Sequence, residues 1–182
     1  RAAEESVAAH LASLRRRYPK LRRAGLSAAL VALDARDGSV LAWVGGDPAD
    51  AEDELDRVRR ARRQPGSTVK PFVLLEALED CGRGDALNVA TRVADEPLQI
   101  ELPGGPWRPE NFDRRHRGVV SLRTALVESL NVPVVRVARH CGFESVGRRL
   151  ARAGLAVPES PPPSISLGAL ETTPLEIAAA YT

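Results

Sequence analysis

The spacing of apolar residues in the N-terminal part of the chain predicts a helix followed by a β-hairpin. Residues 4–17 carry apolar side chains on one helical face, at Val7, Leu11 and Leu14. Two short apolar runs follow, at residues 28–33 and 40–44, and the turn signal Asp37-Gly38 lies between them. Because both runs are almost wholly apolar, we expect hairpin strands that are largely buried.

Helical spacing returns after residue 66 and dominates the rest of the sequence. The ranges expected to be helical are Ser67 to near Gly82, 121–130, 133–140 and 145–153. Thr173-Pro174-Leu175-Glu176 has the pattern of a capping box with proline at the first helical position, which predicts a further helix. Residues 83–120 are rich in proline and glycine, so we expect loops there, with one short strand at 98–102. The connector 47–63 is expected to be a solvated helix or loop. The run Pro161-Pro162-Pro163 is expected to be extended or a turn.

These elements predict an α+β fold in which a hairpin precedes a mostly helical region. A lone hairpin is only marginally stable, so its further strands are expected downstream of Thr182. The 182 residues include no methionine, which indicates a fragment or a processed product. A hydrophobic share of 43% suits a chain with a real core and excludes disorder. The longest wholly apolar run, 28–33, is far shorter than the roughly 20 residues of a membrane-spanning helix, and no signal peptide is expected.

Charge and side-chain chemistry exclude several further classes of protein. Of the 26 Lys and Arg residues only Lys20 and Lys70 are lysines, and 24 acidic residues are interleaved with them, for a net charge of +2. A nucleic-acid-binding module usually carries a clear basic excess, so the arginine clusters are expected to be solvated faces. Cys81 and Cys141 form no CxxC pair and leave the redox compartment open. The three histidines lack ligand spacing, so no metal or cofactor site is predicted.

The tetrapeptide Ser67-Thr68-Val69-Lys70 is the first candidate catalytic motif. Pro65-Gly66 precede it, so Ser67 is expected at a helix N-terminus, where backbone N–H groups favour a developing anion. Lys70 lies on the same helical face and can take the serine proton if its surroundings keep the amine neutral, which arginine cannot do. The alternative interpretation is that Ser67 is an N-cap and nothing more.

A second motif, Ser129-Leu130-Asn131, lies where one expected helix ends and another begins. Such a corner can present side chains into a cleft. The structural alternative for Ser129 and Asn131 is a turn or a helix cap. Spacing alone leaves nucleophilic catalysis and these structural roles equally open.

Ser-x-x-Lys is the nucleophile motif of penicillin-binding proteins and class A β-lactamases. The chain as a whole resembles the transpeptidase domain of class A, bifunctional penicillin-binding proteins, in particular their 1b branch. The matching stretches follow the family's order and are residues 31–46, 61–72, 107–115, 125–133 and 167–176. The resemblance implies a partial penicillin-binding-protein or serine β-lactamase-like fold whose remaining sheet strands are missing.

The resemblance also implies a role for each motif residue. Ser67 would attack the D-Ala-D-Ala carbonyl of a peptidoglycan stem peptide, releasing the last D-alanine and leaving an acyl-enzyme. Lys70 would take the serine proton, Ser129 would relay protons to the leaving nitrogen, and Asn131 would bind the donor peptide and help to hold Lys70. An amine of a neighbouring stem peptide would complete the cross-link, β-lactams would acylate Ser67, and no cofactor would be needed.

One departure from the family concerns its third motif, Lys-Thr/Ser-Gly on a sheet strand, which is absent from this sequence. In the family that motif lies beyond the helix at which this chain ends, so we expect a truncation, and the chain alone is not expected to form cross-links. Residues 1–25 resemble the connecting segment, and residues 26–182 the N-terminal portion of the transpeptidase domain. The family lies on the extracytoplasmic side of the bacterial cytoplasmic membrane, with an anchor outside this chain and other cell-wall synthesis proteins as possible partners.

Two alternatives to cross-linking remain open. Water instead of an amine would make the enzyme a D,D-carboxypeptidase or a β-lactam hydrolase, although Leu130 replaces the aspartate usual in β-lactamases. A non-catalytic scaffold domain in a cell-wall complex would keep the fold and lose the chemistry. The intact Ser67, Lys70, Ser129 and Asn131 disfavour the scaffold.

Overall fold

The structure is a computed structural model that describes residues 1–20, 25–79, 81 and 87–182. Its internal contacts divide the chain into two compact units. The first unit consists of residues 1–63, 153–155 and 171–182, and the second of residues 64–152 and 156–170. Both contain helices and a two-stranded antiparallel sheet, so the α+β class expected from the sequence is confirmed.

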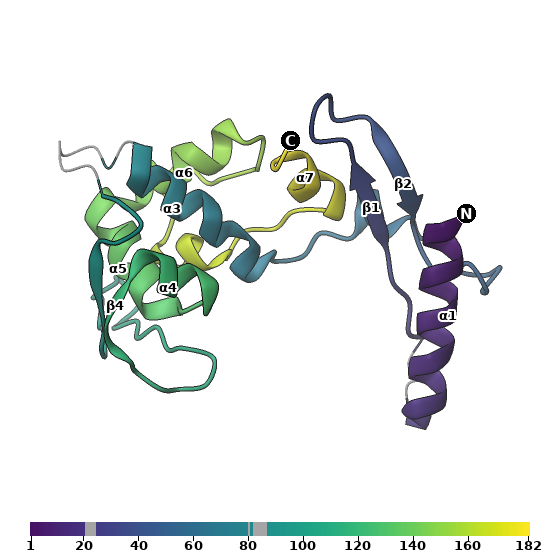
Figure 1. Cartoon of the computed structure of the whole chain (residues 1–182), viewed down its shortest axis with the longest axis horizontal. Coiled ribbons are helices and arrows are strands. Elements are labelled where there is room, and N and C mark those ends of the chain that lie inside the picture. Colours follow the sequence, from purple (N-terminus) through teal and green to yellow (C-terminus); the bar gives the residue numbers. More distant parts are fainter. Residues whose placement is uncertain (21–24, 80, 82–86) are drawn as a thin grey trace. The chain divides into compact units, whose positions relative to one another are not determined.

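The first unit is built on the predicted helix and hairpin. Helix α1 (Ala2–Arg17) lies beside the hairpin (Figure 1), and its Val7 and Leu11 pack against Val44 of the second hairpin strand. Strand β1 (Leu30–Leu33) pairs with β2 (Val40–Val44) in antiparallel register. The hairpin is therefore confirmed, but the expectation of largely buried strands is wrong. Val40 and Leu41 are 55% and 65% exposed, because the packing partners of β2 among the described residues lie at its Val44 end.

Short capped helices complete the first unit. Helix α2 (Arg57–Arg60) begins after Asp56, whose side chain accepts a hydrogen bond from the Val58 N–H. Helix α7 (Pro174–Ala179) begins with the predicted capping box, in which Thr173 and Glu176 each accept from the other's backbone N–H. The predicted C-terminal helix start is thus confirmed, and most of the connector 47–63 is irregular, as expected.

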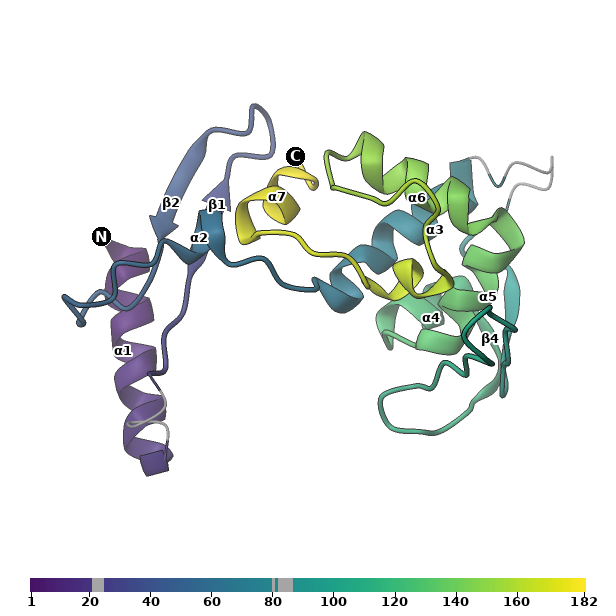
Figure 2. The same ribbon diagram turned by 180° about the vertical axis from the view of Figure 1, so that it is seen from behind.

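The second unit is mostly helical (Figure 2), and within its described residues helix α3 contacts the other five helical elements. Its helical elements are η2 (Gly66–Val69), α3 (Lys70–Glu79), α4 (Leu122–Val127), α5 (Asn131–Cys141), α6 (Phe143–Arg152) and η3 (Pro163–Leu167). The core lies between α3, α5 and α6, where Val73, Val134 and Val146 are fully buried. The helices predicted in this region are confirmed; the predicted end of the first one near Gly82 lies outside the described residues.

The sheet of the second unit differs from the prediction. Residues 98–102 do not form a strand; their one ladder contact is an isolated bridge between Ile100 and Trp107. The apolar side chain of Leu98 instead packs against Val132 and Val135 of α5. The strands are instead β3 (Arg92–Asp95) and β4 (Gly118–Ser121), which pair in antiparallel register.

The proline run also differs in part from the prediction. Pro161 and Pro162 are irregular, but Pro163 is the first residue of the 3₁₀ helix η3. Proline's fixed φ suits a first helical position, where its missing N–H costs little. The expectation of an extended or turn conformation is therefore wrong for Pro163.

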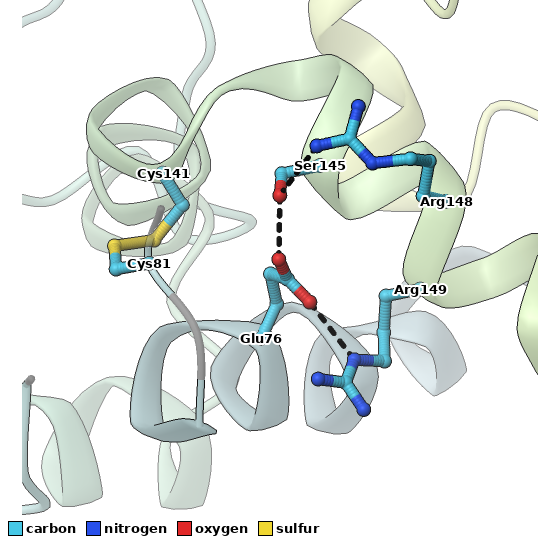
Figure 3. The surroundings of a disulfide bond; sticks show 6 residues. All are labelled: Glu76, Cys81, Cys141, Ser145, Arg148 and Arg149. Carbon is cyan, nitrogen blue, oxygen red and sulfur yellow. Dashed lines mark hydrogen bonds and ion pairs between the residues drawn. A yellow bond between two sulfur atoms is a disulfide. The ribbon is translucent and has the colours of Figure 1, made fainter. Parts of the chain in front are cut away.

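A disulfide joins Cys81, just after α3, to Cys141 at the end of α5 (Figure 3). The sequence left open whether these cysteines meet. Beside the disulfide, the buried carboxylate of Glu76 accepts hydrogen bonds from Ser145 Oγ at 2.6 Å and Arg149 Nε at 2.9 Å. Figure 3 shows that these contacts connect α3 to α6, so α3 is fixed to two neighbouring helices away from its first residue.

Removing the disulfide is expected to destabilise the second unit. The bond joins residues 60 positions apart, and opening a loop of this size costs about 2–5 kcal/mol of unfolding free energy. The double substitution Cys81→Ala/Cys141→Ala should therefore lower the urea midpoint of the full-length protein. A reductant should lower the wild-type midpoint to the same extent and leave the double variant unchanged. Equal midpoints for wild type and variant would contradict the prediction.

Candidate active site

Lys70 is a buried lysine at the first position of α3, with 1% of its surface exposed. Its Nζ donates to Ser129 O at 2.6 Å, to Asn131 Oδ1 at 2.6 Å and to Ser129 Oγ at 3.1 Å. Burial disfavours the charged amine and lowers the pKa of Lys70 from 10.5 to about 8. Three of the four residues predicted for the site, Lys70, Ser129 and Asn131, are thus brought together from segments about 60 positions apart.

Ser67 lies in η2, directly before α3, and its side chain is exposed. The Lys70 N–H donates to the Ser67 carbonyl, so the two residues occupy successive turns of one helical segment. The N-cap position belongs to Pro65, so the alternative role of Ser67 as an N-cap is wrong. In the part of the chain that the structure describes, no hydrogen bond joins the Ser67 hydroxyl to Lys70 Nζ.

The backbone around Ser67 is packed closely against η3. Gly168 follows η3 with φ +82°, and a Cβ at this position would overlap the backbone of Gly66. Gly66 itself has φ +59°. Two glycines thus allow the segment that carries Ser67 to lie directly on the end of η3.

Ser129 lies directly after the C-cap residue of α4 and has a left-handed conformation, with φ +52°. Its N–H donates to Leu126 O and the N–H of Leu130 donates to Ala125 O, which is the hydrogen-bond pattern of a Schellman motif. Leu130 and Ala125 also pack together in one apolar cluster. Glycine is the usual residue at this position, and a serine there strains the backbone. The turn that was the structural alternative for Ser129 is therefore present. The carbonyl and hydroxyl oxygens of Ser129 nevertheless both contact Lys70.

Asn131 begins α5, and both ends of its side-chain amide are bonded. Oδ1 accepts from Lys70, and Nδ2 donates to the carbonyl of Glu110 at 2.7 Å. Its backbone N–H donates to Asn111 Oδ1 at 2.8 Å. Asn131 is therefore the residue through which the loop at 110–111 reaches the lysine.

Sequence reasoning assigned no role to two buried polar residues behind this site, Asp95 and Asn111. Asn111 is 3% exposed and Asp95 is fully buried, and they are hydrogen-bonded to each other. Asn111 lies in one of the stretches that resemble the family, whereas Asp95 ends a strand that the pattern did not predict. The only sequence signal for the pair was the position of Asn111 in that stretch.

A small cavity of about 210 Å³ adjoins Ser129. Its lining residues are Asn111, Phe112, Asp113, Arg117, Glu128, Ser129 and Leu130. Among these residues, Arg117 forms ion pairs with Glu128 at 2.6 Å and Asp113 at 3.0 Å, and the Phe112 side chain is fully exposed. Of the four residues predicted for the site, Ser129 is the one found among these lining residues.

Neither a metal centre nor a membrane span is found in the described ranges of the chain. Within residues 1–20, 25–79, 81 and 87–182, no three His, Cys, Asp or Glu side chains are grouped as metal ligands. None of the helices in those ranges is both long enough and apolar enough to cross a membrane.

The chain as a whole is similar to several known proteins. A family model described as "Penicillin binding protein transpeptidase domain" matches residues 28–182. Penicillin-binding protein 1B of Vibrio cholerae is 40% identical over 158 residues, which are 86% of this chain and 20% of that protein. Penicillin-binding protein 1A of Neisseria gonorrhoeae is 40% identical over 163 residues, or 86% of this chain and 19% of that protein.

Solved structures give the same answer for the fold. Penicillin-binding protein 1A from Haemophilus influenzae superposes with a TM-score of 0.77 at 31% identity, over 86% of this chain and 23% of that one. PonA1 from Mycobacterium tuberculosis superposes with a TM-score of 0.70 at 27% identity, over 84% of this chain and 40% of that one. The expected partial transpeptidase fold is therefore confirmed. The chain spans about a fifth of the length of the curated relatives it matches.

Proposed function

The chain belongs to the transpeptidase domain family of class A penicillin-binding proteins, and from this premise we propose that it supplies the serine nucleophile and the lysine base of a peptidoglycan D,D-transpeptidase. Relatives named 1A and 1B match it at the same 40% identity, so the proposal applies to the class and not to one branch. The observation that carries it is the buried Lys70 amine, bonded to Ser129 and Asn131 and one helical turn after the exposed Ser67.

In the proposed first half-reaction, Ser67 Oγ attacks the carbonyl carbon between the two D-alanines of a donor stem peptide. Lys70 Nζ takes the hydroxyl proton as the new C–O bond forms. The C–N bond then breaks, and the leaving D-alanine nitrogen receives a proton from Lys70 through the Ser129 hydroxyl. The products are free D-alanine and an ester between Ser67 and the donor peptide.

The second half-reaction reverses these steps with a different amine. An acceptor amine of a neighbouring stem peptide attacks the ester carbonyl and transfers its proton through Ser129 to Lys70. The ester bond breaks, Ser67 recovers its proton, and the two peptides are joined by an amide. The backbone N–H of Ser67, in the first turn of a helical segment, supplies one donor to the oxyanion of both tetrahedral intermediates.

The state of Lys70 supports its proposed role as base. With a pKa of about 8, about one amine in ten is neutral at pH 7, whereas about one in three thousand would be neutral at the ordinary value of 10.5. Its three contacts are to uncharged oxygens, and no carboxylate among the described residues forms an ion pair with the ammonium form. The Asn131 amide holds the amine and is the proposed contact for the donor peptide.

Location and domain organisation are proposed on separate grounds. The Cys81–Cys141 disulfide suits an oxidising compartment and supports the extracytoplasmic side of the cytoplasmic membrane. The family match begins at residue 28, which supports residues 1–25 as a connecting segment and residues 26–182 as part of the transpeptidase domain. The proposed ligands are D-Ala-D-Ala stem peptides, acceptor amines and β-lactams, with cell-wall synthesis proteins as the partners of the whole protein.

Covalent labelling of the full-length protein by a fluorescent penicillin tests the proposal. Wild type should be labelled, and Ser67→Ala should not, because the acceptor oxygen is gone. Ser160→Ala removes another exposed hydroxyl of the same unit and should label like wild type. If Ser67→Ala labels like wild type, Ser67 is not the nucleophile; if neither labels, the scaffold interpretation holds.

Product analysis separates cross-linking from hydrolysis. Incubation with glycan strands that carry uncross-linked stem peptides should yield cross-linked peptide dimers and free D-alanine. Trimmed monomers with no dimers would indicate a D,D-carboxypeptidase instead.

A further inference from the structure

Helix α5 has its first turn capped by a residue from a distant loop. Leu130, at the N-cap position, provides no side-chain hydrogen bond to the helix. Asn111 Oδ1 accepts from the backbone N–H groups of Asn131 at 2.8 Å and Val132 at 3.2 Å. These are two of the N–H groups that an α-helix leaves without partners at its start. The position of the Asn131 backbone therefore depends on the Asn111 amide.

Asp95 sets the direction in which that amide points. Asn111 Nδ2 donates to Asp95 Oδ1 at 2.8 Å, to Asp95 Oδ2 at 3.0 Å and to the Arg115 carbonyl at 2.8 Å. A carboxylate only accepts hydrogen bonds, so the nitrogen must face Asp95 and the oxygen must face α5. Asp95 also accepts from the Arg117 N–H at 2.9 Å, and His116 Nδ1 and Arg117 Nη1 lie 3.6 and 4.0 Å from it. The fully buried carboxylate is thus held from several sides.

The same loop also sets the side chain of Asn131. Asn131 Nδ2 donates to the carbonyl of Glu110, the residue before Asn111. With its nitrogen occupied there, the amide presents Oδ1 to Lys70 Nζ at 2.6 Å. A continuous series of hydrogen bonds therefore runs from the Asp95 carboxylate to the lysine amine through Asn111 and Asn131.

We propose that Asp95 and Asn111 are positioning residues for the Lys70 amine, which act through the backbone and side chain of Asn131. The inference rests on the proposed function, because it concerns the rate at which Lys70 activates Ser67. Neither residue contacts Lys70. Their effect is to hold one of the three oxygens that fix the amine. Loss of the outer hydrogen-bond partners of metal ligands typically changes activity about 10- to 100-fold, and we expect an effect of the same size here.

The central variant is Asn111→Asp, which has nearly the same shape as the wild-type side chain. It places a second carboxylate against Asp95 and so disturbs the group that caps α5. Adding Asp95→Asn exchanges the donor and the acceptor. The amide introduced at position 95 can donate to the carboxylate introduced at position 111, whose other oxygen can still cap the helix. The pair of substitutions keeps both the volume and the net charge of the wild type.

The readout is penicillin acylation of the full-length protein, resolved into a limiting rate constant and a half-saturating concentration. Asn111→Asp should lower the limiting rate constant about 10- to 100-fold, since Lys70 acts in that step, with a smaller change in the half-saturating concentration. The double variant Asp95→Asn/Asn111→Asp should recover a clear part of the lost rate.

Val135→Ala is the matched control for general damage to α5. Val135 is fully buried on the same helix, and its truncation should lower the melting temperature while the limiting rate constant stays close to wild type. The inference is overturned if Asn111→Asp acylates like wild type, if the double variant recovers nothing, or if Val135→Ala loses as much rate. If wild type and Ser67→Ala label equally, the proposed function itself fails, and the positioning roles fail with it.

Discussion

Lys70→Arg is expected to slow penicillin acylation of the full-length protein about 10²- to 10⁴-fold, the usual contribution of a positioned general base. Arginine keeps its proton at all accessible pH values, so it cannot accept the proton of Ser67. Its planar guanidinium also cannot place one nitrogen among the three oxygens that surround Lys70 Nζ. Lys20→Arg makes the same change at the chain's other lysine, which is exposed, and should leave the rate unchanged.

The pH dependence of the same reaction gives a second measure of this prediction. Because the pKa of Lys70 is about 8, the wild-type acylation rate should rise about tenfold per pH unit below 8 and level off above it. Lys70→Arg should show no such rise. Acylation of Lys70→Arg at the wild-type rate, or a wild-type rate that does not change from pH 6 to 9, would contradict the assignment of Lys70 as the base.

The free energy of unfolding should also depend on pH through the titration of Lys70, and the direction of this dependence follows from the pKa shift. The folded-state pKa of about 8 lies below the ordinary value of 10.5, so between these pH values the unfolded chain binds more protons at Lys70. The free energy of unfolding contributed by this residue therefore rises with pH across that window, and the full cost of burying the ammonium applies below about pH 8. This rise should be absent from Lys70→Arg.

Ser129→Gly is expected to stabilise the protein and to slow its chemistry at the same time. Ser129 has φ +52°, a conformation that costs a residue with a side chain about 1 kcal/mol and glycine almost nothing. The variant should gain up to about 1 kcal/mol of unfolding free energy. It should also lose penicillin acylation by about 10²-fold or more, because the hydroxyl that contacts Lys70 Nζ at 3.1 Å is gone.

Ser129→Ala is the matched variant, because it removes the same hydroxyl and keeps the strained backbone. The two variants should acylate at similar rates, and only Ser129→Gly should be more stable than wild type. Urea unfolding and penicillin labelling of the full-length protein measure the two effects. Wild-type labelling of Ser129→Gly would show that the hydroxyl relays no proton, and equal stability of the two variants would show that the conformation carries no strain.

Local patterns predicted most of the helices and the first hairpin. The capping box at Thr173 and the apolar spacing of α1 depend on residues within one or two turns, which sequence displays directly. The pair β3 and β4 was missed because its strands are four residues each and lie in a region rich in charge and proline. Leu98 was misread as a strand residue because its apolar character reflects packing on α5.

The residues of the candidate site also fall into those that local spacing could predict and those that it could not. Ser67 and Lys70 lie on one helical segment, so their spacing indicated the pair, and Ser129 and Asn131 were found as a second short motif. The partnership between Asn111 and the start of α5 spans 20 positions and follows no helical or strand period. Neither it nor the pairing of Cys81 with Cys141 can be derived from local spacing, because both depend on how separate elements pack.

The disulfide has a consequence for the order in which the site can assemble. It joins residues 60 positions apart near the ends of α3 and α5, and the contact between Lys70 and Asn131, the first residues of the same two helices, spans 61 positions. Once the sulfurs are linked, the two helices of the candidate site remain tethered, and the loop-closure entropy of bringing them together has already been lost. Their encounter then proceeds at the high effective concentration of an intramolecular reaction. Oxidation of the cysteines during folding would thus favour the later formation of the Lys70 contacts at the opposite ends of both helices.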